Sequence, residues 1–257
     1  MNAAYDLPYT RFALPYSLTS EIEFSEKMAK LTLELMAPMG DIDCKHIIDI
    51  ACGVGAACFY FAKLGYQVSG VDISKDMLDA AKRSLARQNC HIDWFQQDMR
   101  ELCIPKKAEL ITCMYDSLNF MLNPQELTTV FQKVFNLLNP KGVFIFDMYT
   151  ILGLSMHWGE GIEEIHTNET EHFIASNTSW DADTRMAVKT LYGFSQSDEV
   201  WHRWEERHQM HAFSLEEIKE SLIKSGFTNI KPYGLDGLCL TDLSNETKRT
   251  LIVARKS

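Results

Sequence analysis

No stretch of this 257-residue sequence approaches the roughly 20 consecutive apolar residues of a membrane-spanning helix. The beginning of the chain carries an acidic residue, Asp6, and lacks the basic start and apolar core of a secretory signal peptide. We therefore expect a cytoplasmic protein that has no membrane partner.

Basic charge is also scarce. The chain has 25 lysines and arginines against 35 aspartates and glutamates, a net charge of −10. A nucleic-acid-binding surface needs a basic stripe, so nucleic acid is not the expected partner.

The seven cysteines are odd in number and form no C-x-x-C pair, which favours buried thiols over disulfides. The histidines form no H-E-x-x-H motif or His/Cys cluster, and no metal site is expected.

The most informative segment that is present runs from Ile47 to Asp72. It predicts a buried strand, a glycine turn over 52–55, a helix over 56–64 and a second strand that ends at Asp72. A glycine turn between a strand and a helix lets backbone N–H groups approach a ligand at the positive end of the helix. An acid about twenty residues later can accept hydrogen bonds from ribose hydroxyls. The segment is therefore predicted to bind a nucleoside.

Strands and helices alternate over the following residues. Helices are expected after Ser74 and from Pro124, and strands over 91–95, 109–114 and 142–148. This alternation predicts a doubly wound, Rossmann-like α/β fold, whose ligands bind beyond the carboxyl ends of the strands. A single aspartate at a strand end is explained by a turn or a helix cap, but five at consecutive ends indicate a site. These are Asp49, Asp72, Asp98, Asp116 and Asp147.

The residues Asp49, Ala51, Gly53 and Gly55 resemble motif I of the class I S-adenosylmethionine-dependent methyltransferases, a D-x-G-x-G-x-G pattern. Alanine stands at position 51, where glycine is usual. The segment Y-D-S-L-N-F after the fourth strand resembles the D-S-x-N-Y of a subgroup that acts on small molecules. It lacks the [ND]-P-P-[YF] of nucleic-acid methyltransferases. The resemblance covers about 45–150 and the last helix and strands, and it implies a seven-stranded sheet.

The resemblance also implies S-adenosylmethionine as cofactor and a role for each matching position. Asp49 would hold the amino group of the cofactor, and Asp72 would bind its ribose hydroxyls. Ile73 would lie on one face of the adenine, Asp98 would read the adenine edge, and Tyr115 would close the methionine side. The implied cofactor-binding set is Asp49, Ala51, Gly53, Gly55, Asp72, Ile73, Met77, Asp98, Met99 and Tyr115.

About sixty residues, 151–212, interrupt the link between the fifth strand and the last helix. Their partly alternating β-branched and aromatic residues predict a small antiparallel sheet, mounted as a lid beside the reacting methyl group. Residues 155–211 contain eleven acids and four bases, and an acidic, aromatic-rich lid suits an amine or another cation. A solvated outer face also explains most of these charges.

The remaining segments complete the predicted organisation. Residues 1–44 would form a tail and an amphipathic helix, opened by Ser20 and Glu23, that cover the cofactor site. A tyrosine of the tail (Tyr5, Tyr9 or Tyr16) would touch the cofactor, as in many related methyltransferases, or the tail would simply dock on the core. Residues 45–150 form the core, 151–212 the lid, and 213–257 the last helix and closing strands.

The predicted function is methyl transfer from S-adenosylmethionine to nitrogen or oxygen of a small molecule, with an amine among the acceptors and S-adenosylhomocysteine as product. A base is needed only if the attacking atom starts protonated, and Asp116 and His211 are the predicted bases, although packing alone also explains His211.

A nicotinamide-dependent oxidoreductase is disfavoured because Cys58 replaces the third glycine of its fingerprint. A non-catalytic cofactor-binding subunit is the other alternative. A monomer or a homodimer is expected.

Overall fold

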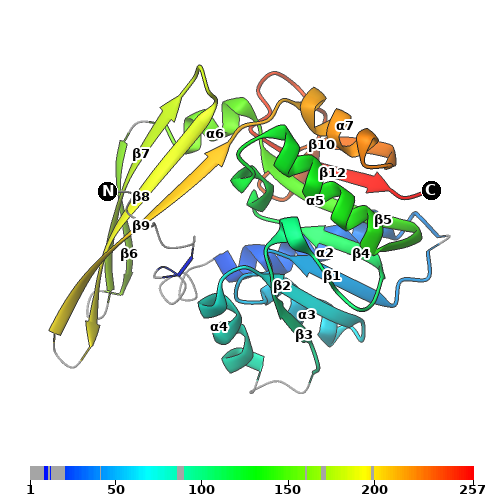
Figure 1. Cartoon of the computed structure of the whole chain (residues 1–257), viewed down its shortest axis with the longest axis horizontal. Helices are drawn as coiled ribbons and strands as arrows, with labels where there is room; N and C mark the ends of the chain where they lie inside the picture. Colours follow the sequence, from blue (N-terminus) through cyan, green and yellow to red (C-terminus); the bar gives the residue numbers. More distant parts are fainter. Residues whose placement is uncertain are drawn as a thin grey trace.

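The computed structural model describes residues 9, 10, 12, 21–40, 42–85, 90–159, 161–168, 172–197 and 200–257. This part of the chain forms two sheets (Figure 1). The larger sheet has eight strands in the order β11-β10-β12-β5-β4-β1-β2-β3, and the smaller sheet has four in the order β6-β7-β8-β9. The prediction of a doubly wound α/β fold with an inserted antiparallel sheet is confirmed.

Five strands of the larger sheet are parallel, and their carboxyl ends share one edge. The central strand β1 is buried at every position because helices cover both faces of the sheet. The five strands are β1 (His46–Ile50), β2 (Gln67–Asp72), β3 (Asp93–Gln96), β4 (Ala108–Cys113) and β5 (Leu138–Tyr149).

Each face of the larger sheet has its own core. Helices α2 (Glu21–Met36) and α3 (Ala56–Lys63) pack over Ile47 of β1. Helices α5 (Pro124–Leu137) and α7 (Leu215–Lys224) pack on the opposite face. Helix α4 (Lys75–Leu85) follows β2. Asn123 caps α5 as its sequence predicts, because its side chain accepts the Glu126 N–H at 2.9 Å.

The antiparallel end of the larger sheet differs from the prediction in one respect. Strand β12 (Arg249–Arg255) pairs with β5, and β10 (Thr228–Asp236) pairs with β12. The chain then turns at Gly237 and adds an eighth strand, β11 (Cys239–Thr241), where seven strands were predicted. A three-residue edge strand is too short to show the alternation by which strands are recognised in a sequence.

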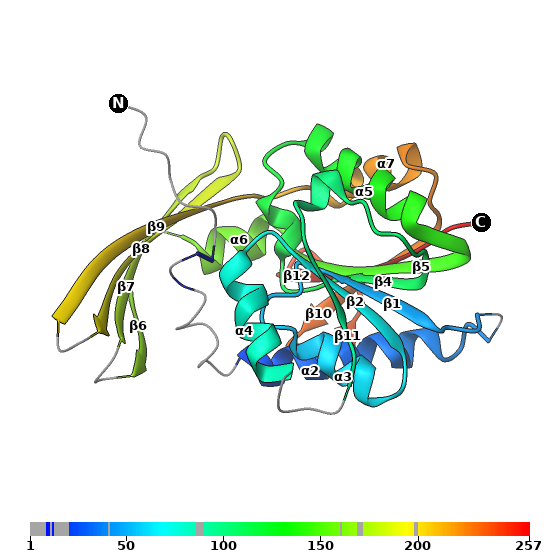
Figure 2. The same ribbon diagram turned by 60° about the horizontal axis from the view of Figure 1, so that its bottom comes forward.

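The smaller sheet is built from four consecutive antiparallel strands (Figure 2). A short helix that was not predicted, α6 (Ile151–His157), leads into it from the end of β5, and the Thr150 hydroxyl caps this helix. Because α6 starts where β5 ends, the smaller sheet stands beside the carboxyl edge of the parallel strands. Its strands are β6 (Gly161–Asn168), β7 (His172–Asp181), β8 (Met186–Ser197) and β9 (Val200–His211).

Two expectations about the first residues lie outside the described part of the chain. Ser20 of the expected capping box is not described, and neither are Tyr5 and Tyr16. Among the described residues, no helix is both long and apolar enough to cross a membrane.

Candidate functional site

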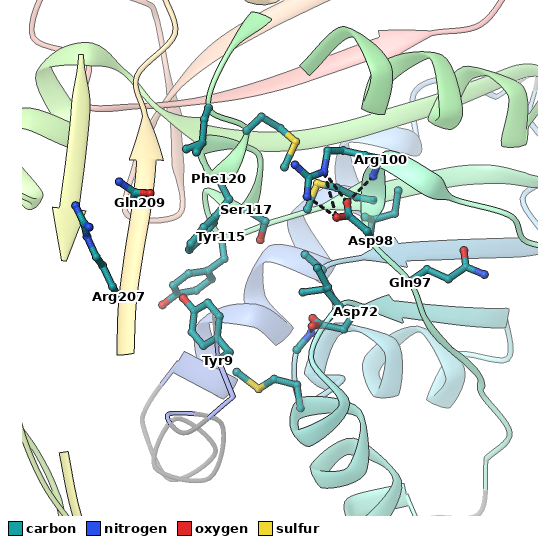
Figure 3. A pocket seen from close by; sticks show the side chains of 18 residues that line it. Tyr9, Asp72, Gln97, Asp98, Arg100, Tyr115, Ser117, Phe120, Arg207 and Gln209 are labelled. Carbon is teal, nitrogen blue, oxygen red and sulfur yellow. Dashed lines mark hydrogen bonds and ion pairs between the residues drawn. The ribbon is translucent and has the colours of Figure 1, made fainter. Parts of the chain in front are cut away.

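A cavity of about 310 Å³ lies where the parallel strands end, with β9 on its opposite side (Figure 3). Eight of the ten predicted cofactor-binding residues line it, and only Asp49 and Gly55 do not. Seven of them lie at or just after the ends of β1, β2, β3 and β4, which the topology places at one edge of the sheet, and Met77 lies in α4. The eight are Ala51, Gly53, Asp72, Ile73, Met77, Asp98, Met99 and Tyr115.

The glycine turn has a left-handed backbone at alternate positions. The φ angles of Ala51, Gly53 and Gly55 are 54°, 54° and 80°. Glycine adopts this region readily, whereas alanine is strained in it, so position 51 would suit glycine better. A Cβ atom added at Gly53 would meet nothing within 4 Å, which leaves this backbone open beside the cavity.

Gly55 was expected to bind the cofactor, but it lies against the side chain of Trp94. A Cβ atom added there would lie 2.5 Å from the Cη2 atom of Trp94. Gly55 also forms the amino-terminal cap of α3 and is absent from the cavity wall. The structure therefore explains this glycine by close packing against β3.

Asp72 ties the end of β2 to the glycine turn. Its Oδ2 atom accepts the Gly53 N–H and its Oδ1 atom accepts the Ser74 N–H, both at 2.8 Å. Burial raises the pKa of this carboxyl group, although the backbone hydrogen bonds act against that shift. A carboxylate oxygen has two acceptor sites, so each oxygen can accept one more hydrogen bond from a ligand hydroxyl.

Asp98 begins the short 3-10 helix Met99–Glu101 and binds Arg100, which was not among the predicted site residues. The Asp98 Oδ1 atom accepts the Arg100 N–H at 2.8 Å, and its Oδ2 atom lies 2.5 Å from Nη2 of Arg100. Partial burial opposes these contacts, but Arg100 still holds the pKa of Asp98 below its usual value. Arg100 thus adds a cation to the wall beside Asp98.

Asp49 lies behind the glycine turn in a smaller cavity of about 50 Å³, which Ala51, Gly53 and Tyr115 also line. The Thr112 hydroxyl donates to its Oδ1 atom at 2.6 Å. Burial raises the pKa of Asp49 to about 6. Asp49 is therefore next to the main cavity, beneath the turn that separates the two spaces.

The structure does not bring either predicted base to the main cavity. Asp116 is buried, and its Oδ1 atom lies 2.6 Å from Nη2 of Arg249. His211 packs against Phe213 with ring centroids 4.5 Å apart, and neither of its ring nitrogens has a hydrogen-bond partner among the described residues. Burial lowers the pKa of His211. Neither side chain lines the main cavity, and their role as bases stays a prediction.

Asp147 and Arg249 hold the turn after β4. Tyr115 and Asp116 have φ angles of 68° and 50°, and both donate their backbone N–H groups to the Asp147 carboxylate, at 2.6 and 3.2 Å. Arg249 bridges Asp147 and Asp116 through its two terminal nitrogens. Non-glycine residues are strained at positive φ, so these contacts fix a conformation that the turn would not adopt alone. They place Tyr115 in the cavity wall.

The smaller sheet contributes Arg207 and Gln209 of β9 to the cavity, and neither was predicted (Figure 3). No acidic residue of this sheet whose side chain is described lines the cavity. Glu205 is exposed and pairs with Arg203, whereas Glu206 is buried and accepts the backbone N–H groups of Tyr9 and Phe12.

Tyr9 also lines the cavity. It is one of the three tail tyrosines for which contact with the cofactor was an expectation. Phe120 and Ser117, in the short 3-10 helix Ser117–Phe120, complete the wall next to Tyr115. In the described part of the chain, no three His, Cys, Asp or Glu residues are grouped so that they could hold a metal ion. The cavity therefore has carboxylates at the strand ends and the polar side chains of Arg207 and Gln209 on the side of β9.

Comparisons with known proteins agree with this arrangement. Residues 47–142 match a family model described as a methyltransferase domain. A putative methyltransferase of Geobacillus sp. (strain WCH70) is 28% identical over 184 residues, which cover 72% of this chain and 74% of that protein.

Solved structures extend the similarity of fold to both sheets. A S-adenosylmethionine-dependent methyltransferase from Clostridium acetobutylicum has a TM-score of 0.79 at 24% identity, over 90% of this chain and 91% of its own. The sugar N-methyltransferase KedS8 from Streptoalloteichus sp. has a TM-score of 0.70 at 16% identity, over 100% and 95% of the two chains.

Proposed function

We propose that this chain is a class I S-adenosylmethionine-dependent methyltransferase and that it transfers a methyl group to a nitrogen or oxygen atom of a small molecule. One observation carries the proposal: a single cavity has the features of a nucleoside site at the strand ends and β9 on its opposite side. In this proposal the cofactor occupies the strand ends, and the acceptor enters between them and the lid formed by 151–212.

The residues of the cavity fit the cofactor. Asp72 would accept hydrogen bonds from both ribose hydroxyls with the acceptor sites that its backbone partners leave open. The open backbone at Gly53 allows a ligand to approach closely. Asp98 and the Met99 backbone would read the adenine edge, and Ile73 and Met77 would lie against the ring.

The methionine end of the cofactor would lie at the glycine turn. Ala51 and Tyr115 line both the main cavity and the smaller cavity that contains Asp49. This position allows the Asp49 carboxylate to attract the amino group of the cofactor, and it allows Tyr115 to cover the same end.

The chemistry of the proposed reaction requires mainly alignment. When bound, S-adenosylmethionine supplies an electrophilic methyl group, which an acceptor lone pair attacks in line with the departing sulfur. The chain contributes by enclosing the cavity with apolar side chains such as Phe120 and Met121, which exclude water from the reacting atoms.

An amine is the acceptor that this cavity favours. Asp116 and His211 do not reach it, and the two described carboxylates in its wall, Asp72 and Asp98, are assigned to the cofactor. A neutral amine has an available lone pair and needs no side-chain base before it attacks, whereas an alcohol is a weak nucleophile until it loses its proton. The similarity in fold to a sugar N-methyltransferase supports the same choice.

The test is an assay of the purified protein with S-adenosylmethionine and a panel of amino sugars, alkylamines and phenols. We expect a methylated amine by mass spectrometry and an equal amount of S-adenosylhomocysteine. Methylation of phenols alone would overturn the choice of an amine. Binding of the cofactor without transfer to any member of a broad panel would favour the non-catalytic alternative.

A further inference from the structure

A continuous chain of hydrogen bonds joins the lid to the acid at the end of β2. Glu206 of β9 accepts the Tyr9 N–H at 2.5 Å and the Phe12 N–H at 3.2 Å, one with each carboxylate oxygen. The Tyr9 carbonyl group then accepts the Ser74 hydroxyl at 2.7 Å, and the Ser74 N–H donates to Asp72 at 2.8 Å. Tyr9 therefore links the lid to the proposed ribose site, and Glu206 holds both Tyr9 and Phe12 (the segment).

The anchor of this link is buried. The Glu206 side chain is 0% exposed, and its Oε1 atom lies 2.5 Å from Nε2 of His208, which is 3% exposed. A buried carboxylate is costly unless hydrogen-bond donors surround it. The two backbone N–H groups of the segment and His208 supply those donors. Detaching the segment would leave Glu206 short of two of them, so the contact favours the docked segment.

Docking of the segment places Tyr9 across the opening between α4 and β9. The Tyr9 ring packs on His208, with ring centroids 4.9 Å apart, and on Phe120 at 6.2 Å. Tyr9 also packs against the buried cluster of Val54, Met77 and Ala80. Figure 3 shows Tyr9 between Asp72 and β9, in the wall of the cavity. A ligand in the cavity is therefore covered by Tyr9 as long as the segment stays on Glu206.

We propose that Glu206 is a positioning residue for the methyl transfer: it holds Tyr9 and Phe12 in place, with Tyr9 over the cavity, and so retains the cofactor and its demethylated product. This inference rests on the proposed function, because the retained ligand is the cofactor of that reaction. Glu206 acts through Tyr9 and touches neither reactant. Release of S-adenosylhomocysteine then requires the contact between Glu206 and the segment to open.

The test compares Glu206→Gln with Glu205→Gln. In Glu206→Gln the side-chain amide would turn an N–H donor toward one of the two backbone N–H groups, so the segment would lose an acceptor. Glu205 is the next residue of β9, its side chain is 43% exposed, and it pairs with Arg203 at 3.0 Å. The measurement is the dissociation rate of S-adenosylhomocysteine, together with the number of ligands bound per chain.

We expect Glu206→Gln to release S-adenosylhomocysteine at least tenfold faster than the wild-type protein at unchanged stoichiometry, and Glu205→Gln to match the wild type. If Glu206 only stabilised the fold, Glu206→Gln would instead lower the number of ligands bound per chain. The dissociation rate at the remaining sites would then be unchanged. That result, or an equal rate in all three proteins, overturns the role of Glu206 while the proposed function stands. No binding to the wild-type protein would remove the proposed function itself.

A second variant keeps the test decisive if Glu206→Gln does not fold. Ser74→Ala removes the hydroxyl that the Tyr9 carbonyl accepts, and with it the acceptor of the Met77 N–H at the start of α4. We expect faster release of S-adenosylhomocysteine from this variant as well. A wild-type release rate in folded Ser74→Ala would contradict the coupling between the segment and the cavity.

Discussion

The Nη1 atom of Arg249 lies 2.7 Å from the Oδ2 atom of Asp147, in a pair whose side chains are 13% and 0% exposed. Arg249 also binds Asp116, and Asp147 accepts the backbone N–H groups of Tyr115 and Asp116. One arginine on β12 therefore controls the conformation of the turn that carries part of the cavity wall. Its ion pairs are buried, which makes their loss costly.

The substitution Arg249→Met should destabilise the protein strongly. It leaves two buried carboxylates without their cation, and we expect the free energy of unfolding to fall by about 3–5 kcal/mol. Urea denaturation measures the change. The matched control is Arg203→Met, which breaks an exposed pair with Glu205 and should cost less than about 1 kcal/mol. Equal losses in the two variants would contradict the importance assigned to the buried pairs.

The two glycines of the turn should respond differently to substitution by alanine. Both have positive φ, so each substitution should cost about 1–2 kcal/mol of backbone strain. Gly55→Ala also drives a methyl group into Trp94, and overpacking adds about 1–3 kcal/mol. Gly53→Ala meets no such neighbour and should be the more stable variant. A higher thermal denaturation midpoint for Gly55→Ala than for Gly53→Ala would show that Trp94 is not the constraint at this position.

The turn was recognisable in the sequence because its signals are local. Gly53, Gly55 and Asp72 lie within one strand–helix–strand unit, and the ends of parallel strands must meet at one edge of the sheet. The roles of the two glycines were not separable, because the contact of Gly55 with Trp94 depends on how β3 packs.

The ion pair of Asp116 could not be predicted from the sequence, for a long-range reason. Its partner Arg249 lies 133 residues away in the sequence, and no periodicity or spacing connects the two. Glu206 and His208 could have been recognised, because they alternate with Met210 on one face of β9, and that face is buried. The summed charge of the region concealed this pattern.

Asp49 should make the stability of the protein depend on pH. Its pKa rises from 3.8 to about 6 because the folded protein buries it, so the folded state holds its proton more tightly than the unfolded state does. The contribution of Asp49 to the free energy of unfolding is therefore largest below about pH 4. It falls as the pH rises towards 6 and is constant above that, a change on the order of 3 kcal/mol.

The variant Asp49→Asn tests this directly, since asparagine resembles the protonated acid and does not ionise. Urea denaturation at about pH 4.5 and about pH 7 should show a smaller loss of stability for the variant than for the wild-type protein. Parallel losses in the two proteins would mean that Asp49 does not hold a raised pKa.

The central claim is that a sulfonium nucleoside binds at the carboxyl edge of the sheet and that Asp72 holds its ribose. The most direct test is a calorimetric titration of the wild-type protein, Asp72→Asn and the exposed control Asp76→Asn with S-adenosylhomocysteine and with NADH. We predict that the wild type and Asp76→Asn bind S-adenosylhomocysteine and not NADH, and that Asp72→Asn binds it roughly 10- to 100-fold more weakly. Wild-type affinity in Asp72→Asn, or preference for NADH, would contradict the claim.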